Sequence, residues 1–190
     1  MNFIKINEAV QFASVAHDGQ YRKKLNVPYI SHPCTAAIIL MSYLPNTHFS
    51  EKEKEEMVVA TILHDVWEDT DVTLEEIEER FGKQVAEYVK GASEQDKSLP
   101  WEERKRQKIE ALKTKSLNLK YIVCADKVHN LLSIIEDQKE YGDEVWSRFK
   151  RGKREQEWYY RSIYDSLVYG MEGDVPVFFH FYKNLIEQCF

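Results

Sequence analysis

The segment HDVWED gathers several metal-ligand residue types in one short stretch. His64 and Asp65 stand side by side, and Glu68 and Asp69 follow them. If a helix continues through the segment, Glu68 lies one turn after His64 and Asp69 one turn after Asp65. Carboxylates held this close repel one another unless a cation lies among them. Imidazole and carboxylate together suit Mn²⁺, Fe²⁺ or Zn²⁺ better than Ca²⁺. The alternative is a solvated helix end followed by a turn.

Two further segments carry single residues of the same kinds. His32 precedes Pro33, and proline suits the first turn of a helix, so His32 is expected near a helix start as a ligand, a cap or a buried ring. Asp126 lies in the apolar stretch YIVCADKVHN, where a carboxylate is costly to bury unless it is paired or metal-bound. Lys127 offers an ion pair as the alternative. Asn130 follows one helical turn after Asp126.

The elements that position these residues are expected to be helices. Glycine and proline are scarce, at 7 and 5 residues, and apolar residues recur mostly with a helical period. A helix over about 50–65 is apolar on all sides in its second half, so that half is predicted to be central. Asn7 is predicted to cap the first helix, and Thr73 with Glu76 forms a capping box that starts another.

The remaining elements complete an all-α prediction. Residues 18–31 and 93–100 interrupt the helical period and are expected to be loops. A charged helix follows from Trp101, and the aromatic-rich chain after Tyr141 predicts one or two more helices. No stretch alternates convincingly with period two, so any sheet is expected to be small.

Length, charge and cysteine usage narrow the class of protein. The 190 residues fit one domain, and the net charge of −6 argues against a general nucleic-acid binder. No stretch matches a signal peptide or a membrane span, and the 3 cysteines show no metal-binding spacing. A cytoplasmic protein without a membrane or nucleic-acid polymer partner is therefore expected. An anionic substrate would need local positive charge, and Arg22, Lys23 and Lys24 supply a basic cluster, unless this is a solvated loop.

The order H…HD…D over three predicted helices resembles the HD-domain metal-dependent phosphohydrolase superfamily. The segments RKKLNVPYISHP, LHDVWEDT, SEQDKSLP and ADKVHN, in that order, are similar to the hydrolase domain of the RelA/SpoT family, and most of all to its small stand-alone (p)ppGpp hydrolases. The resemblance implies an HD-domain helical bundle in a single domain over 1–190, with a motif core at about 5–135 and a helical extension at 136–190.

The resemblance also implies residue roles. One divalent metal, usually Mn²⁺ in this family with Fe²⁺ or Zn²⁺ as alternatives, would be held by His32, His64, Asp65 and Asp126. The acidic pair Glu68 and Asp69 would lie near the attacking water. The substrate-binding residues would be Arg22, Lys23, Lys127 and Asn130. A substrate rim is assigned to the 93–100 loop and the helix after it, with Ser93, Lys97, Arg104 and Lys105.

The implied reaction is removal of the 3′-pyrophosphate of ppGpp or pppGpp, which yields GDP or GTP and pyrophosphate. One alternative is an HD-type enzyme for another nucleotide: a nucleotidase, a phosphodiesterase, or a hydrolase of other 3′- or 2′-phosphorylated nucleotides. The other is a non-catalytic nucleotide sensor. The pair Glu68 and Asp69 argues against a sensor, because binding alone needs no water-activating pair. The aromatic C-terminal region leaves a homodimer open.

Overall fold

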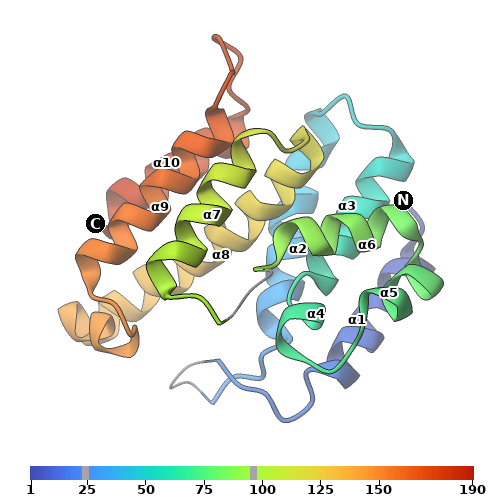
Figure 1. Cartoon of the computed structure of the whole chain (residues 1–190), viewed down its shortest axis with the longest axis horizontal. Helices are drawn as coiled ribbons and strands as arrows, with labels where there is room; N and C mark the ends of the chain where they lie inside the picture. Colours follow the sequence, from blue (N-terminus) through green and yellow to red (C-terminus); the bar gives the residue numbers. More distant parts are fainter. Residues whose placement is uncertain (23–25, 95–97) are drawn as a thin grey trace. The chain divides into compact units, whose positions relative to one another are not determined.

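The computed structural model of the chain describes residues 1–22, 26–94 and 98–190, and this part is all-α (Figure 1). It contains no β-strand within those ranges; a single antiparallel bridge joins Tyr21 and Pro28. The predicted fold class is therefore confirmed. Lys23, Lys24 and Lys97, named above as site or rim candidates, lie outside the described residues.

The chain forms two compact units. The first comprises Met1–Gln95 with Leu117–Asp126, and the second comprises Asp96–Ser116 with Lys127–Phe190. The long helix α8, Leu117–Tyr141, contributes its first part to one unit and the rest to the other. The single domain over 1–190 stays a prediction.

Helix α3 forms the centre of the first unit. The helices of this unit are α1 Phe3–Ala16, α2 Ser31–Tyr43, the 3-10 turn η1 Leu44–Asn46, α3 Glu51–Leu63, α4 Val66–Asp69, α5 Leu74–Phe81 and α6 Lys83–Ala92. Every residue of α3 from Met57 to Leu63 is buried, and α3 packs against α1, α2 and α6. An all-round apolar helix needs neighbours on all sides, so the predicted central position is confirmed.

The capping residues define where two of these helices begin. Ser50 and Thr73 each start a helix with a complete capping box, as predicted for Thr73 and Glu76. The predicted cap Asn7 is wrong, because Asn2 caps α1 by accepting from the Ile4 amide. The N-terminus is held against α3: the Asn2 amide donates to the Glu55 carboxylate at 2.8 Å.

The second unit is rich in aromatic side chains. Its elements besides α8 are α7 Trp101–Lys113, η2 Gly142–Arg148, α9 Lys153–Val168 and α10 Val177–Cys189. Helix α9 packs against α7 and α10 (Figure 1). Tyr182 is fully buried and donates to the Tyr160 carbonyl at 2.9 Å, and Trp146 stacks on Phe190. The aromatic C-terminal region therefore builds a core here.

Within the described residues, no helix combines the length and the hydropathy that crossing a membrane requires.

Candidate metal centre

Helices α2, α3 and α4 and the first part of α8 bring four predicted ligands together. His32 is the second residue of α2, and Pro33 lies in the same first turn, as predicted. His64 and Asp65 form the junction between α3 and α4, and Asp126 lies in a fully buried stretch of α8. His32, His64 and Asp126 offer ligand atoms within 4.8 Å of one another.

The distances within this cluster suit ligands around one cation. His32 Nε2 lies 3.3 Å from Asp126 Oδ1 and 3.6 Å from Asp65 Oδ2. His64 Nε2 lies 3.1 Å from Asp65 Oδ2 and 3.7 Å from Asp126 Oδ1. Two ligand atoms that are each about 2.1 Å from a shared metal stand ~3.0 to ~3.4 Å apart, depending on the bond angle. Two of the four distances fall in this range and the other two exceed it by about 0.2–0.3 Å, so small side-chain movements would bring the four ligands around one divalent metal.

The tautomer of His64 points to the same conclusion. Its Nδ1 lies 2.7 Å from the Thr61 carbonyl oxygen, which can only accept, so Nδ1 carries the hydrogen. In the neutral ring Nε2 then holds a lone pair, and among the residues that the structure describes this buried atom has no hydrogen-bond partner. Two carboxylate oxygens face it. Such a lone pair is stabilised by a metal ion or by a proton.

Protonation of the cluster without a metal follows the same electrostatics. Burial opposes charge on His64, but the carboxylates of Asp65 and Asp126 outweigh it and raise the pKa of His64 well above its ordinary value. Burial likewise opposes charge on Asp65, yet the two imidazoles hold the pKa of that carboxyl below its usual range. Burial lowers the pKa of His32, so this ring stays neutral and keeps its lone pair for a ligand role.

The structure also bears on the alternatives for these residues, and it rules out one of them. His64 is buried, with 3% of its surface exposed, so the alternative of a solvated helix end is wrong. His32 is buried as well, at 1%, and lies against two carboxylates. Lys127 is buried, and its ammonium lies 5.6 Å from the centre of the Tyr159 ring.

The acidic pair lies on the short helix α4, directly after the cluster. A helical hydrogen bond from the Asp69 amide to the Asp65 carbonyl, 2.9 Å, continues the turn. Glu68 is half-buried, and its Oε2 accepts from the Glu94 amide at 2.9 Å. Asp69 is exposed, and its backbone carbonyl accepts from the Gln20 side chain. The hydrogen bond from the Glu94 amide therefore fixes the position of the Glu68 carboxylate.

Sequence reasoning missed Tyr29, which donates to Asp65 Oδ2 at 2.6 Å. Burial, and after it the charge of Asp65, raises the pKa of Tyr29, so the hydroxyl stays protonated. His17, which had no partner pattern in the sequence, is buried against the Tyr29 ring at 4.9 Å between centroids. The available signal was the position of Tyr29, an aromatic residue with a polar end three places before His32.

The predicted substrate residues fall in different places. The Arg22 guanidinium lies 6.0 Å from the Tyr29 ring centre, at the edge of the cluster. Asn130 and Lys127 lie on α8 after Asp126, in the part that belongs to the second unit. Ser93, which was expected at a substrate rim, is buried, and its hydroxyl lies 3.0 Å from the His64 carbonyl; the substrate contact stays a prediction.

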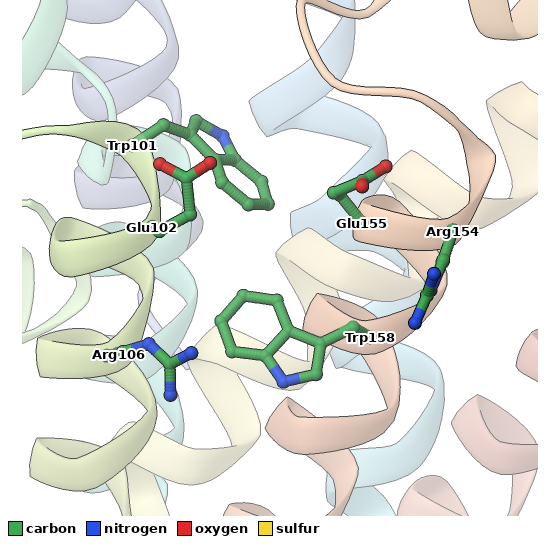
Figure 2. A pocket seen from close by; sticks show the side chains of 6 residues that line it. All are labelled: Trp101, Glu102, Arg106, Arg154, Glu155 and Trp158. Atoms are coloured by element: carbon green, nitrogen blue, oxygen red, sulfur yellow. The ribbon is translucent and has the colours of Figure 1, made fainter.

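A separate cavity of about 300 Å³ lies in the second unit (Figure 2). It is lined by Trp101, Glu102 and Arg106 of α7 and by Arg154, Glu155 and Trp158 of α9. Arg106 lies over the Trp158 ring, and Glu102 is paired with Arg151 at 3.0 Å. None of the predicted site residues that the structure describes lines this cavity. The charge of Glu102, one of the side chains that line the cavity, is therefore already balanced by an ion pair within the protein.

Known proteins resemble the chain along most of its length. A family model described as HD domain matches residues 9–152. The guanosine-3′,5′-bis(diphosphate) 3′-pyrophosphohydrolase MESH1 of Danio rerio is 42% identical over 65% of this chain, and the chain spans just under two thirds, 66%, of that relative. The human protein of the same name is 35% identical over 95% of this chain and 92% of its own length.

A solved structure gives the same picture in three dimensions. It is described as a metazoan ortholog of SpoT that hydrolyzes ppGpp, and it aligns with a TM-score of 0.75 and 29% identity. The alignment covers 97% of this chain and 94% of that one. Because the family model covers most of the sequence and the helices superpose along nearly the whole chain, this protein belongs to the HD-domain family.

Proposed function

We propose that this protein is a metal-dependent pyrophosphohydrolase that removes the 3′-pyrophosphate of ppGpp or pppGpp. Water adds to the phosphorus atom that is bonded to the 3′ oxygen. The bond between this phosphorus and the 3′ oxygen breaks, and the 3′ oxygen leaves with a proton. The products are GDP or GTP and pyrophosphate. The relatives that carry this activity in their names supply the substrate class.

One observation carries the proposal: the buried His64 Nε2 faces the carboxylates of Asp65 and Asp126, and within residues 1–22, 26–94 and 98–190 no group donates a hydrogen bond to it. His32 completes the proposed ligand set. Mn²⁺ is the proposed metal, since this donor set suits transition metals. A divalent metal held there supplies Lewis acidity toward a phosphoryl oxygen and makes water more acidic.

The remaining residues have roles that follow from their chemistry. Glu68, anchored by the Glu94 amide, is proposed to orient the attacking water and take its proton, with Asp69 beside it. Arg22 is proposed to grip phosphate or stack on the base, because guanidinium can do both. Lys23, Lys127 and Asn130 are proposed to complete the substrate contacts.

The deciding experiment measures pyrophosphate release from ppGpp by the purified protein, with Mn²⁺ and with EDTA. A panel with pppGpp, other 3′-phosphorylated nucleotides and a 2′-phosphorylated dinucleotide tests the substrate class. Turnover of ppGpp that requires Mn²⁺ is expected. Tight, metal-dependent binding of ppGpp without any turnover would refute catalysis and support a sensor. Turnover of another panel member alone would refute the substrate.

The setting is part of the same proposal. We propose a cytoplasmic enzyme, and the free thiols of Cys34 and Cys189 are in keeping with a reducing compartment. A homodimer stays a prediction, to be checked by light scattering of the purified protein.

A further inference from the structure

We propose that Tyr29 is a positioning residue for the metal centre: its hydroxyl fixes the Asp65 carboxylate, and its ring holds His32 in orientation. The inference rests on the proposed metal centre. Tyr29 donates to Asp65 Oδ2 at 2.6 Å, and this same oxygen lies 3.1 Å from His64 Nε2 and 3.6 Å from His32 Nε2. One hydrogen bond therefore reaches the oxygen on which both imidazoles converge.

The hydrogen bond leaves the carboxylate able to bind a metal. A carboxylate oxygen has more than one lone pair, so Oδ2 can accept from Tyr29 and still offer a pair to a cation. The phenol removes the rotation of the Asp65 side chain that would otherwise have to be frozen on binding. The ring of Tyr29 also meets the ring of His32 edge to face, at 5.8 Å and 70°. Two ligands from two helices are thus oriented by one side chain.

Tyr29 is itself held from its other side by His17 and Gln20. The Gln20 side-chain amide donates to the Asp69 carbonyl at 2.9 Å, which leaves Gln20 Oε1 as an acceptor. His17 Nδ1 lies 2.9 Å from that oxygen and must carry the hydrogen. The His17 ring, buried and oriented in this way, packs on the Tyr29 ring at 4.9 Å and 44°.

The backbone completes this support. The Tyr29 amide donates to the Gln20 carbonyl at 2.8 Å, and the Arg22 amide donates to the Val27 carbonyl at 2.9 Å. These bonds join residues 20–22 to residues 27–29, within the described part of the connection between α1 and α2. The Gln20 side chain also donates to the carbonyl of Asp69 in α4. These hydrogen bonds hold the backbone that carries Tyr29 close to Asp65.

A structural role can be separated from positioning by removing one oxygen atom. Tyr29→Phe keeps the ring that packs on His17 and His32 and deletes only the donor to Asp65. Tyr164→Phe, on α9 in the second unit, is the matched control with the same chemical change. Mn²⁺ affinity is measured directly, by titration of EDTA-treated, desalted protein followed by the signal of free Mn²⁺ in electron paramagnetic resonance.

The expected result is a 10- to 100-fold weaker Mn²⁺ affinity in Tyr29→Phe, about the usual effect of losing a hydrogen bond to a ligand. Tyr164→Phe should bind Mn²⁺ like the wild type. In EDTA both variants should unfold cooperatively, with Tyr29→Phe lower in Tm by no more than about 2–4 °C, the loss expected for one hydrogen bond. Equal affinity in Tyr29→Phe and wild type overturns the inference. A wild type that binds no Mn²⁺ instead overturns the metal centre, and the positioning role with it.

A double variant tests the route of the effect. If Tyr29 acts through Asp65, adding Tyr29→Phe to Asp65→Ala, which removes the acceptor, should change the remaining Mn²⁺ affinity by much less than Tyr29→Phe does in the wild type. The same fold loss in both backgrounds would mean that the hydroxyl does not act through this carboxylate, and would overturn the proposed route.

Discussion

Replacing Glu68 in two ways separates its proposed chemistry from its place in the fold. In the structure its Oε2 accepts a 2.9 Å hydrogen bond from the Glu94 amide, and both residues are half-buried. Glu68→Gln keeps an oxygen that can accept from this amide but removes the basic carboxylate. Glu68→Ala removes the carboxylate and the acceptor together.

The two effects have different magnitudes. Loss of a positioned general base slows turnover about 10²- to 10⁴-fold, which corresponds to roughly 3–5 kcal/mol in the barrier. Both variants should show this loss. Glu68→Ala also leaves the Glu94 amide without this acceptor, which should lower the free energy of unfolding by about 1 kcal/mol because the site is only half-buried. In a protein of this size that is a drop of about 2–4 °C in Tm.

Three measurements on the same samples check the reasoning: pyrophosphate release from ppGpp, Mn²⁺ binding, and thermal unfolding. Glu68→Gln should lose turnover while it binds Mn²⁺ and unfolds like the wild type. Glu68→Ala should lose turnover, bind Mn²⁺ and unfold earlier. Full activity of Glu68→Gln would refute its role as the base. Loss of Mn²⁺ binding in Glu68→Gln would instead indicate that Glu68 is a metal ligand.

The other predictions concern the ligands, the substrate contact and the supporting hydrogen bonds. Asp126→Ala should abolish Mn²⁺ binding and turnover together; turnover that survives would remove Asp126 from the proposed ligand set. Arg22→Ala should raise KM for ppGpp by 10-fold or more, since charge-assisted bonds contribute about 1.5–3 kcal/mol, with a smaller change in kcat; an unchanged KM contradicts the contact. Ser93→Ala removes the hydroxyl beside the His64 carbonyl and should lower Tm by about 2–4 °C, a shift that calorimetry would detect. In EDTA, burial disfavours charge on His64, but Asp65 and Asp126 outweigh it and raise the folded-state pKa of His64 above 6.5. The contribution of the protonated His64 ring to folding stability is therefore fully present below about pH 6.5 and is lost as pH rises through the raised pKa. Urea unfolding from about pH 6 to about pH 9 should show this fall in wild type and a flatter profile in His64→Gln; equal profiles would contradict the pairing.

The sequence by itself determined the helices and the ligand set to be tested. The capping box at Thr73 needs only two residues three positions apart. It can therefore be recognised from the sequence alone, and it forms as predicted. The apolar half of α3 predicted its central position for the same reason, since burial on every side requires apolar residues on every side. His32, His64, Asp65 and Asp126 were selected by their types and order, and the fold brings them together.

Only the tertiary structure decided which residues support the cluster. Tyr29 meets Asp65 across 36 positions of sequence, and Ser93 meets the His64 carbonyl across 29. Asn7 was the wrong cap: the Asn2 side chain accepts from the Ile4 amide, and the Met1 amine and the Asn2 amide also donate to Glu51 and Glu55 of α3. A hydrogen bond between distant segments leaves no period or spacing in the chain, because its geometry exists only after the helices have packed.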